Sequence, residues 1–330
     1  MLLPSLQRSP RRDGPDGRGM LEIHFPEILD FLIRPFHQIN DGNTSPMKKT
    51  ASLLLAVIIS AFLSVDARSQ TLRLWEGDAP GATGSEKTDI PEMTLHFPRE
   101  RTEKMPAVLI IPGGGYKHLS APGFFISQMT EMGFVCAAMK YRLPVNGYRQ
   151  PYPLTDARRA FCTLRANAEK RGVDPDRIGI LGWSSGGHVS TSLLVHHQLA
   201  DEEKRDAIDQ VDARPDFAVL FCPVVTMKEH AHTPSVARLL GPEPPQSLVD
   251  YYSNEEHVTA DTPRTFLVHA ADDRLVLPEN SRQFYDALQK QGVNSKLLIY
   301  QEPCGHGIGN VADFWRQPLK QWLTEIDVLR

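Results

Sequence analysis

A serine in a short glycine-rich motif is the first residue whose type and spacing could do chemistry. The sequence GWSSG at 182–186 has the pattern G-x-S-x-G, and it lies between a predicted strand over 178–181 and a predicted helix over 185–200. A serine in such a strand–turn–helix setting lies in a sharp turn with its hydroxyl exposed, where it can act as a nucleophile. We expect Ser184 to be this nucleophile, since only Ser184 has glycine two positions before it and two positions after it. The backbone N–H of Ser185 is then expected to stabilise the oxyanion that forms.

A second motif, with three consecutive glycines, is predicted to supply further oxyanion donors. The sequence PGGGY at 112–116 follows a predicted strand over 107–111. Consecutive glycines allow backbone N–H groups to approach a ligand closely, so Gly114 and Gly115 are expected to donate hydrogen bonds beside Ser185. The motif does not fit a phosphate-binding loop, because no Lys-Ser or Lys-Thr pair follows at the required spacing.

A serine hydroxyl is a weak nucleophile unless a histidine base and an orienting acid accompany it. His306 lies between two glycines after the last predicted strand, 296–300, and is the expected base. The acid is expected after the strand predicted over 265–269, where Asp272 and Asp273 are adjacent and spacing alone does not separate them. The chain order of serine, aspartate and histidine is that of the α/β-hydrolase triad.

Alternating strands and helices are predicted to position these residues. Six apolar segments have the near-continuous hydrophobicity of strands buried on both faces: 107–111, 135–140, 178–181, 217–221, 265–269 and 296–300. Five longer amphipathic segments are predicted as helices: 123–131, 155–170, 185–200, 279–291 and 313–328. The alternation predicts an α/β fold with a doubly wound, mostly parallel sheet that is flanked by helices, in a single domain.

One stretch, 227–260, interrupts this alternation with four prolines and three histidines. So long an excursion is expected either to cover a site or to be plain surface structure, and the sequence does not decide between them. His230 and His232 have no acidic or cysteine partner at a recurring ligand spacing, and the four cysteines form no metal motif. We therefore expect no metal and no organic cofactor.

The composition is that of an ordinary globular chain of 330 residues, with 41% hydrophobic and 23% charged residues. The formal net charge of −4 shows no basic excess, so neither a nucleic acid nor an anionic membrane is an expected partner.

The amino-terminal part is predicted to carry an export signal. Residues 47–69 fit a signal peptide, because two lysines precede an apolar run over 53–63 and small residues suit a cut before Gln70. That run is shorter than the ~20 residues of a membrane-spanning helix, so no stable membrane insertion is expected. Residues 1–46 are expected to be a non-native or disordered leader, which a start codon assigned too far upstream explains most simply; a genuine long leader is the alternative. The expected mature chain, 70–330, is a secreted or periplasmic catalytic domain.

From about Leu74 to its end, the chain resembles the secreted α/β-hydrolase esterases. These are acetyl esterases and acetylxylan-esterase-like proteins, often loosely labelled xylanases, and they are related to the hormone-sensitive-lipase-like esterases. The resemblance rests on these segments: LW at 74–75, APG at 79–81, PGGGY at 112–116, KYR at 140–142, DARRA at 156–160, RIG at 177–179, SSGGH at 184–188, TPRTFL at 262–267 and ENS at 279–281.

The resemblance also implies which carboxylate is the acid. In the family pattern the acid stands six residues before the glutamate of the ENS segment, a position that Asp273 occupies. The sequence departs from related patterns at two positions. Pro112 stands where the hormone-sensitive-lipase group has histidine, and Ser185 stands where alanine is usual. Neither change removes a backbone donor, so the resemblance still implies an active site.

The function implied by the resemblance is that of a serine carboxylic-ester hydrolase that uses an acyl-enzyme. Its expected substrates are short acyl esters of small molecules or carbohydrates, in particular acetyl groups on xylan-type saccharides. Two alternatives stay open. A serine peptidase of the prolyl-oligopeptidase kind usually carries a large propeller, for which the 261 residues of 70–330 leave no room. An inactive hydrolase fold that serves as a binding module would not need Ser184, Asp273 and His306 together. The sequence leaves the oligomeric state undetermined.

Overall fold

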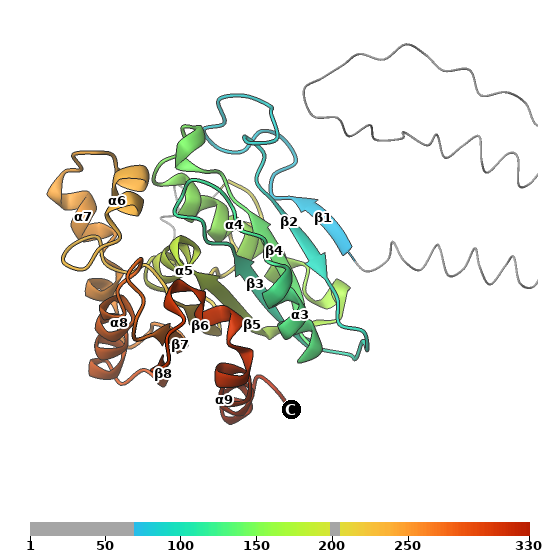
Figure 1. Ribbon diagram of the computed structural model, residues 1–330. Coiled ribbons are helices and arrows are strands. Elements are labelled where there is room, and N and C mark those ends of the chain that lie inside the picture. Colours follow the sequence, from blue (N-terminus) through green and yellow to red (C-terminus); the bar gives the residue numbers. More distant parts are fainter. Residues whose placement is uncertain (1–68, 199–204) are drawn as a thin grey trace, which may run out of the picture. The chain divides into compact units, whose positions relative to one another are not determined.

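The computed structural model describes residues 69–198 and 205–330 (Figure 1). The leader expected over 1–46 lies outside the described residues, as does all of the expected signal peptide except Ser69. No helix among the described residues is long and apolar enough to cross a membrane.

Within the described residues, eight strands form one sheet: β1 (Ser69–Arg73), β2 (Glu92–His96), β3 (Met105–Ile111), β4 (Val135–Lys140), β5 (Val173–Trp183), β6 (Phe217–Phe221), β7 (Arg264–Ala270) and β8 (Ser295–Tyr300). Their order is β1-β2-β4-β3-β5-β6-β7-β8. Strands β3 to β8 run parallel, whereas β1 and β2 pair antiparallel at one edge. From β3 the chain turns to β4 on one side and then crosses to β5 on the other, as in a doubly wound sheet. The predicted fold class, an α/β-hydrolase fold with a mostly parallel sheet flanked by helices, is confirmed.

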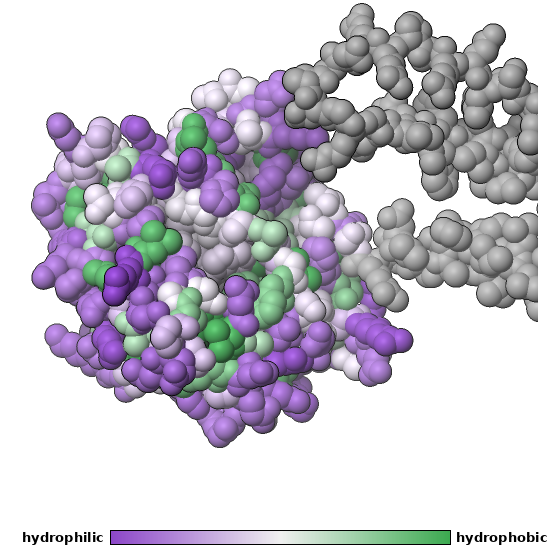
Figure 2. Space-filling model, viewed as in Figure 1, coloured by the Kyte–Doolittle hydropathy of each residue, from purple (hydrophilic) through white to green (hydrophobic). Residues whose placement is uncertain are grey.

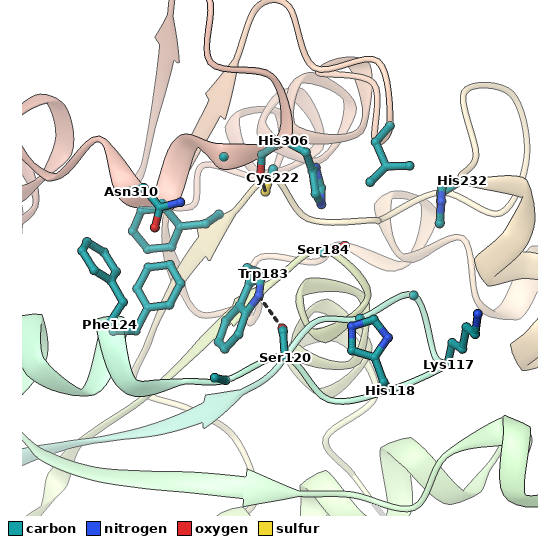
Figure 3. A pocket seen from close by; sticks show the side chains of 18 of the residues that line it. Lys117, His118, Ser120, Phe124, Trp183, Ser184, Cys222, His232, His306 and Asn310 are labelled. Atoms are coloured by element: carbon teal, nitrogen blue, oxygen red, sulfur yellow. Dashed lines mark hydrogen bonds between the residues drawn. The ribbon is translucent and has the colours of Figure 1, made fainter. Parts of the chain in front are cut away.

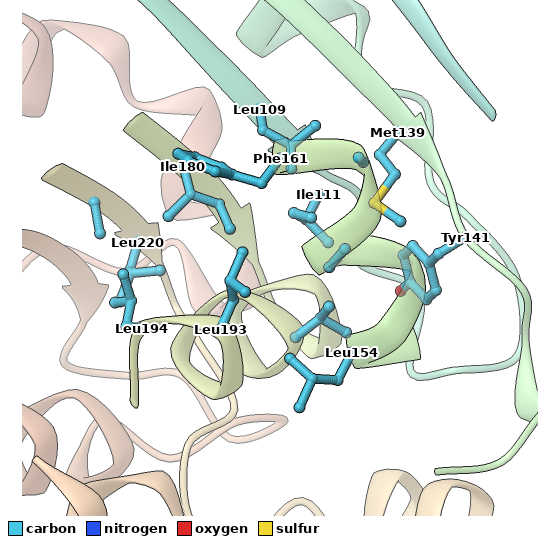
Figure 4. Packing of buried hydrophobic residues seen from close by; sticks show 14 of the residues in the cluster. Leu109, Ile111, Met139, Tyr141, Leu154, Phe161, Ile180, Leu193, Leu194 and Leu220 are labelled. Carbon is cyan, nitrogen blue, oxygen red and sulfur yellow. The ribbon is translucent and has the colours of Figure 1, made fainter. Parts of the chain in front are cut away.

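Helices cover both faces of the sheet. The described α-helices are α3 (Gly123–Glu131), α4 (Tyr152–Ala166), α5 (Ser185–Val195), α6 (Thr233–Leu240), α7 (Gln246–Tyr251), α8 (Glu279–Lys290) and α9 (Ala312–Glu325). Alternate residues of β3 point to opposite faces. Leu109 and Ile111 join the core with α4, α5 and α8 (Figure 4), while Val108 and Ile110 join the core with α3 and α9. Both faces are therefore buried, which explains the continuous apolar runs.

The observed elements differ from the predicted ones in several places. The helix predicted over 185–200 is α5, which ends at Val195, and the strand predicted over 178–181 is the longer β5. Strand β2 alternates half-buried and buried residues, so it has no continuous apolar run, and neither β1 nor β2 was among the predicted strands. The helix predicted over 155–170 ends at Ala166, and a separate 3₁₀ turn precedes Gly172, whose φ of 69° is left-handed. The stretch 227–260 contains α6 and α7, and Pro234 lies in the first turn of α6, where its missing N–H breaks no hydrogen bond.

A buried ion pair joins the segment after β4 to α4. Arg142 Nη2 lies 2.6 Å from Asp156 Oδ1, and neither side chain is exposed to solvent. The same guanidinium donates to the carbonyl O of Pro80 at 2.8 Å, and it lies over the ring of Tyr148. Arg142 thus ties the chain before β2 to the helical layer that carries α4.

Candidate active site

Ser184 lies in the sharp turn between β5 and α5. Its backbone has φ 55° and ψ −128°, a strained conformation for a residue with a side chain. A Cβ on Gly186 would lie 2.2 Å from the carbonyl O of Ile111, so the turn requires glycine at that position. The N–H of Ser184 donates to the carbonyl O of Phe221 at 3.2 Å, which joins the turn to the end of β6. The turn therefore has the geometry expected of a nucleophile elbow.

His306 and Asp273 form a hydrogen-bonded pair beside this turn. The distance from His306 Nδ1 to Asp273 Oδ2 is 2.7 Å; the Asp273 side chain is fully buried, whereas that of His306 is 25% exposed. The other carboxylate oxygen, Oδ1, accepts hydrogen bonds from the backbone N–H groups of Leu275 and Val276 at 2.9 and 3.1 Å. The carboxylate is thus fixed on both sides, and its Oδ2 faces His306 Nδ1 at 2.7 Å and His269 Nε2 at 3.3 Å.

The surroundings of this pair favour opposite charges on its two members. Burial alone would raise the pKa of Asp273, but hydrogen bonds from His269 and His306 outweigh burial and hold that pKa below its usual range. Burial alone would lower the pKa of His306, but the hydrogen bond to Asp273 and the neighbouring Cys222 sulfur outweigh burial and raise that pKa to about 10. The site therefore stabilises the imidazolium that His306 forms when it accepts a proton.

Asp272, the other candidate acid, has a different contact. Its Oδ1 accepts hydrogen bonds from the backbone N–H groups of Cys304 and Gly305, at 3.2 and 2.9 Å. These hydrogen bonds hold the pKa of Asp272 below its usual range. Asp272 thus supports the loop before His306, whereas Asp273 contacts the imidazole itself.

The backbone of the PGGGY motif places free N–H groups beside Ser184. Gly114 and Gly115 have φ angles of 129° and 60°, and both residues line the same cavity as Ser184. Their N–H groups donate no hydrogen bond within the described part of the chain. Ser185 begins α5, so its N–H has no partner within the helix, and the positive end of the helix dipole favours an anion there. These are the three donors expected for an oxyanion.

Side chains that the sequence did not point to hold this loop in place. The N–H of Tyr116 donates to Ser185 Oγ at 3.3 Å, and Arg238 Nη1 donates to the carbonyl O of Gly115 at 2.8 Å. The peptide between Gly115 and Tyr116 is therefore held at both its N–H and its C=O. The Tyr116 hydroxyl also pairs with His188 Nδ1 at 2.7 Å, in the buried core. The hydroxyl of Ser185 thus has a contact of its own, beyond its backbone N–H.

A cavity of about 590 Å³ is lined by Ser184, His306, Gly114, Gly115 and Arg238. Figure 3 shows Phe124 and Trp183 on one side of Ser184, and Lys117, His118 and His232 on the other. Phe124, which lines the cavity, is one of the exposed large hydrophobic residues. The face of the molecule in Figure 2 is largely hydrophilic, with small hydrophobic patches. The cavity therefore has an aromatic end and a basic end.

The stretch 227–260 contributes to the basic end of this cavity. His232 and Arg238 line it, and His232 Nδ1 pairs with Ser235 Oγ at 2.7 Å. Burial, and then the charges of His306 and Arg238, lower the pKa of His232. Of the two readings that the sequence left open, the structure favours a segment that covers a site.

One group of side chains has the donor types of a metal site. The ligand atoms of Cys222, Asp273 and His306 lie within 4.8 Å of one another in the described structure. A metal ion between them would take the His306 Nδ1 and the Asp273 oxygen that now share a hydrogen bond of 2.7 Å. The observed geometry therefore fits a base–acid pair better than a ligand set.

Comparison with known proteins shows the family. The sequence model of the BD-FAE family matches residues 93–288, more than half of the chain. The chain belongs to the BD-FAE family. This BD-FAE family member is 32% identical over 234 residues to the acetylxylan esterase of Xylanibacter ruminicola, a match that covers 67% of this chain and 45% of that protein. It is 33% identical over 214 residues to endo-1,4-beta-xylanase B of Butyrivibrio fibrisolvens, covering 62% of this chain and 33% of that protein.

The BD-FAE family member thus spans less than half the length of these two relatives. Among solved structures, it is similar to the acetyl ester-xyloside bifunctional hydrolase from Caldicellulosiruptor lactoaceticus. The two share 32% identity and a TM-score of 0.72, over 80% of this chain and 98% of that chain. These matches confirm the resemblance to α/β-hydrolase esterases, a family of carboxylic ester hydrolases.

Proposed function

We propose that this protein is a serine carboxylic-ester hydrolase with Ser184, His306 and Asp273 as its catalytic triad. The observation that carries the proposal is the 2.7 Å hydrogen bond between His306 and a buried carboxylate, in the cavity that also exposes the strained Ser184. A histidine held in this way presents its other nitrogen, Nε2, as the base that a serine nucleophile requires.

The proposed reaction proceeds through an acyl-enzyme. Ser184 Oγ attacks the ester carbonyl carbon while His306 Nε2 accepts the hydroxyl proton, and the carbonyl oxygen becomes an oxyanion. The backbone N–H groups of Gly114, Gly115 and Ser185 donate to that oxyanion. His306 then protonates the leaving alcohol, which leaves the acyl group on Ser184. Water, deprotonated by His306, attacks the acyl-enzyme and releases the acid.

The proposed substrates are short acyl esters, in particular acetyl groups on xylan-type oligo- or polysaccharides. The support for the saccharide is that relatives named as an acetylxylan esterase and an acetyl ester-xyloside hydrolase are 32% identical to this chain. Glycoside cleavage is not proposed, although one relative is named a xylanase. It usually needs two carboxylates that flank the bond, and no aspartate or glutamate lines the cavity in the described structure.

The test compares Ser184→Ala with the wild-type protein and with Ser127→Ala, an exposed serine of α3, as the control. We expect Ser184→Ala to lower kcat on 4-nitrophenyl acetate by about 10⁴ to 10⁶, without a change in the thermal midpoint of unfolding. A fluorophosphonate should label the peptide that contains Ser184. Retained activity in Ser184→Ala, or a label elsewhere, would refute the proposal.

The same assay separates the two alternatives that the sequence left open. Butyrate and octanoate esters measure the acyl preference, and a peptide 4-nitroanilide measures peptidase activity. Faster cleavage of the anilide would favour a peptidase, and wild-type protein no faster than Ser184→Ala would favour a binding module.

Export to the periplasm or the exterior is also proposed, on the support of the signal-peptide pattern over 47–69. Amino-terminal sequencing of protein from the exported fraction should begin at Gln70. A mature protein that keeps Met47 would contradict this proposal.

A further inference from the structure

The basic end of the cavity contains no acid. Within the described structure, the cavity is lined by Lys117, His118, His232 and Arg238 but by no aspartate or glutamate. The chain as a whole has 40 acidic residues and 36 lysines and arginines. The basic lining therefore does not reflect the composition of the chain, which is acidic.

The two permanent cations at this end have no carboxylate partner. Arg238 is half-buried and Lys117 is exposed. Some other buried or half-buried cations of the described structure have a carboxylate partner, as Arg142 has Asp156 and Arg165 has Asp216. By contrast, neither Lys117 nor Arg238 forms an ion pair among the described residues.

Most N–H donors of the Arg238 guanidinium form no hydrogen bond in the described structure. Its only hydrogen bond in the described structure joins Nη1 to the carbonyl O of Gly115, and the side chain is half-buried. A guanidinium has five N–H donors in a planar fork that matches a carboxylate. A half-buried cation without a counter-charge has lost hydration that an anion can replace. Burial is the main cause of the lowered pKa of His232, and the charges of His306 and Arg238 add to it.

We propose that the basic end of the cavity binds a carboxylate on the alcohol part of the substrate, so that the preferred substrate is a short acyl ester of an acidic saccharide. The inference rests on the proposed function, in which a short acyl group such as acetyl has no charge of its own. The negative charge must then lie on the saccharide, as in a uronic acid. The guanidinium of Arg238 and the ammonium of Lys117 pair with it, while His118 and His232 offer ring nitrogens to neighbouring hydroxyls.

The test uses two substrates that differ in one charge, an O-acetylated methyl glucuronoside and the matching O-acetylated methyl glucoside, with acetate release as the readout. We expect wild-type kcat/KM to be about tenfold higher for the glucuronoside at low salt, and the preference to fall as ionic strength rises. Lys117→Gln and Arg238→Gln should each lower this preference. Lys170→Gln, a lysine remote from the cavity lining, is the control and should leave it unchanged.

The ratio of the two substrates separates charge recognition from loop positioning. Loss of the contact between Arg238 and Gly115 would slow both substrates equally, whereas loss of charge pairing slows the glucuronoside alone. By contrast with Arg238, the side chain of Lys117 donates no hydrogen bond to the PGGGY loop in the described structure, so the Lys117 variant tests charge without loss of such a bond. No preference in the wild type, or a preference that neither substitution lowers, would overturn the inference.

Failure of the proposed function gives a different result. Wild-type protein that cleaves neither saccharide nor 4-nitrophenyl acetate would refute the esterase proposal. Free glucuronate and glucose then decide the inference by themselves: glucuronate should raise the thermal midpoint more than glucose does, and Lys117→Gln should remove the difference. Equal effects of the two sugars would refute carboxylate binding.

Discussion

Replacing Asp273 by asparagine should invert a hydrogen bond rather than merely weaken it. In the wild type, Oδ1 accepts from the N–H groups of Leu275 and Val276, and Oδ2 pairs with His306 Nδ1 at 2.7 Å. The single oxygen of an asparagine must remain with the two backbone donors. Its NH₂ group then faces His306 and donates to Nδ1, which moves the ring proton to Nε2. A histidine in that tautomer cannot accept the proton of Ser184.

The size of the loss follows from two contributions. The lost charge-assisted hydrogen bond corresponds to about 1.5–3 kcal/mol, a factor of about 10 to 150 in rate. The wrong tautomer adds to this, because the active one must form against a donor that opposes it. The expected total is about 10⁴ in kcat, or ~5.5 kcal/mol. Asp272→Asn is the matched control, because one amide oxygen can still accept from both Cys304 and Gly305, and its kcat should fall by less than about threefold.

Both variants should be assayed on 4-nitrophenyl acetate at saturating substrate, with urea denaturation to show that they remain folded. Equal losses in the two variants would refute the assignment of the acid. A larger loss in Asp272→Asn would do the same, and it would identify the exposed carboxylate as the functional one.

Three further predictions concern the surroundings of the triad. Ser185→Ala keeps the backbone N–H of residue 185 but removes the hydroxyl that accepts a hydrogen bond from the Tyr116 N–H, so kcat should fall about tenfold with little change in KM. An unchanged kcat would show that the PGGGY loop does not need this hydroxyl. His306 must be neutral to act as a base, so its raised pKa should place the acidic limb of the kcat/KM profile above pH 6.5. Cys222→Ala removes one cause of the raised pKa and should shift this limb to lower pH, whereas Cys162→Ala should not. An upward shift in Cys222→Ala would contradict the argument. Arg142→Met leaves a buried carboxylate unpaired and should lower the free energy of unfolding by about 3–5 kcal/mol, measured by urea denaturation; a change below about 1 kcal/mol would show that the pair is dispensable.

The sequence predicted the strands with buried faces best, and the contacts between distant segments least. Strands β4 and β6 begin and end where the pattern predicts, because a strand buried on both faces has a continuous apolar run. Ser184 and His306 were found from local glycines and chain order, and the structure brings both to one cavity. The choice of Asp273 over Asp272 needed the resemblance to a family, because adjacent carboxylates differ only in where the loop points them.

The contact between Arg238 and Gly115 was not predicted. These residues lie 123 positions apart, and their contact depends on how α6 packs over the PGGGY loop. The side-chain role of Ser185 was missed for a related reason. The position of Ser185 directly after the nucleophile predicted only a backbone donor, whereas the acceptor role of its hydroxyl depends on the position of Tyr116.

The position of α6 has a consequence for attempts to redesign this protein. Segments between late strands of a hydrolase sheet are attractive points for exchange, because loops tolerate replacement better than the scaffold that carries them. In this protein, exchange of the segment that contains α6 would remove Arg238 and its hydrogen bond to the carbonyl O of Gly115. A chimera with a foreign segment over 227–260 would therefore change the rate of acyl transfer together with the choice of substrate. Under the proposed function, one guanidinium would link selectivity to turnover, and a library that varies the segment should keep Arg238 fixed.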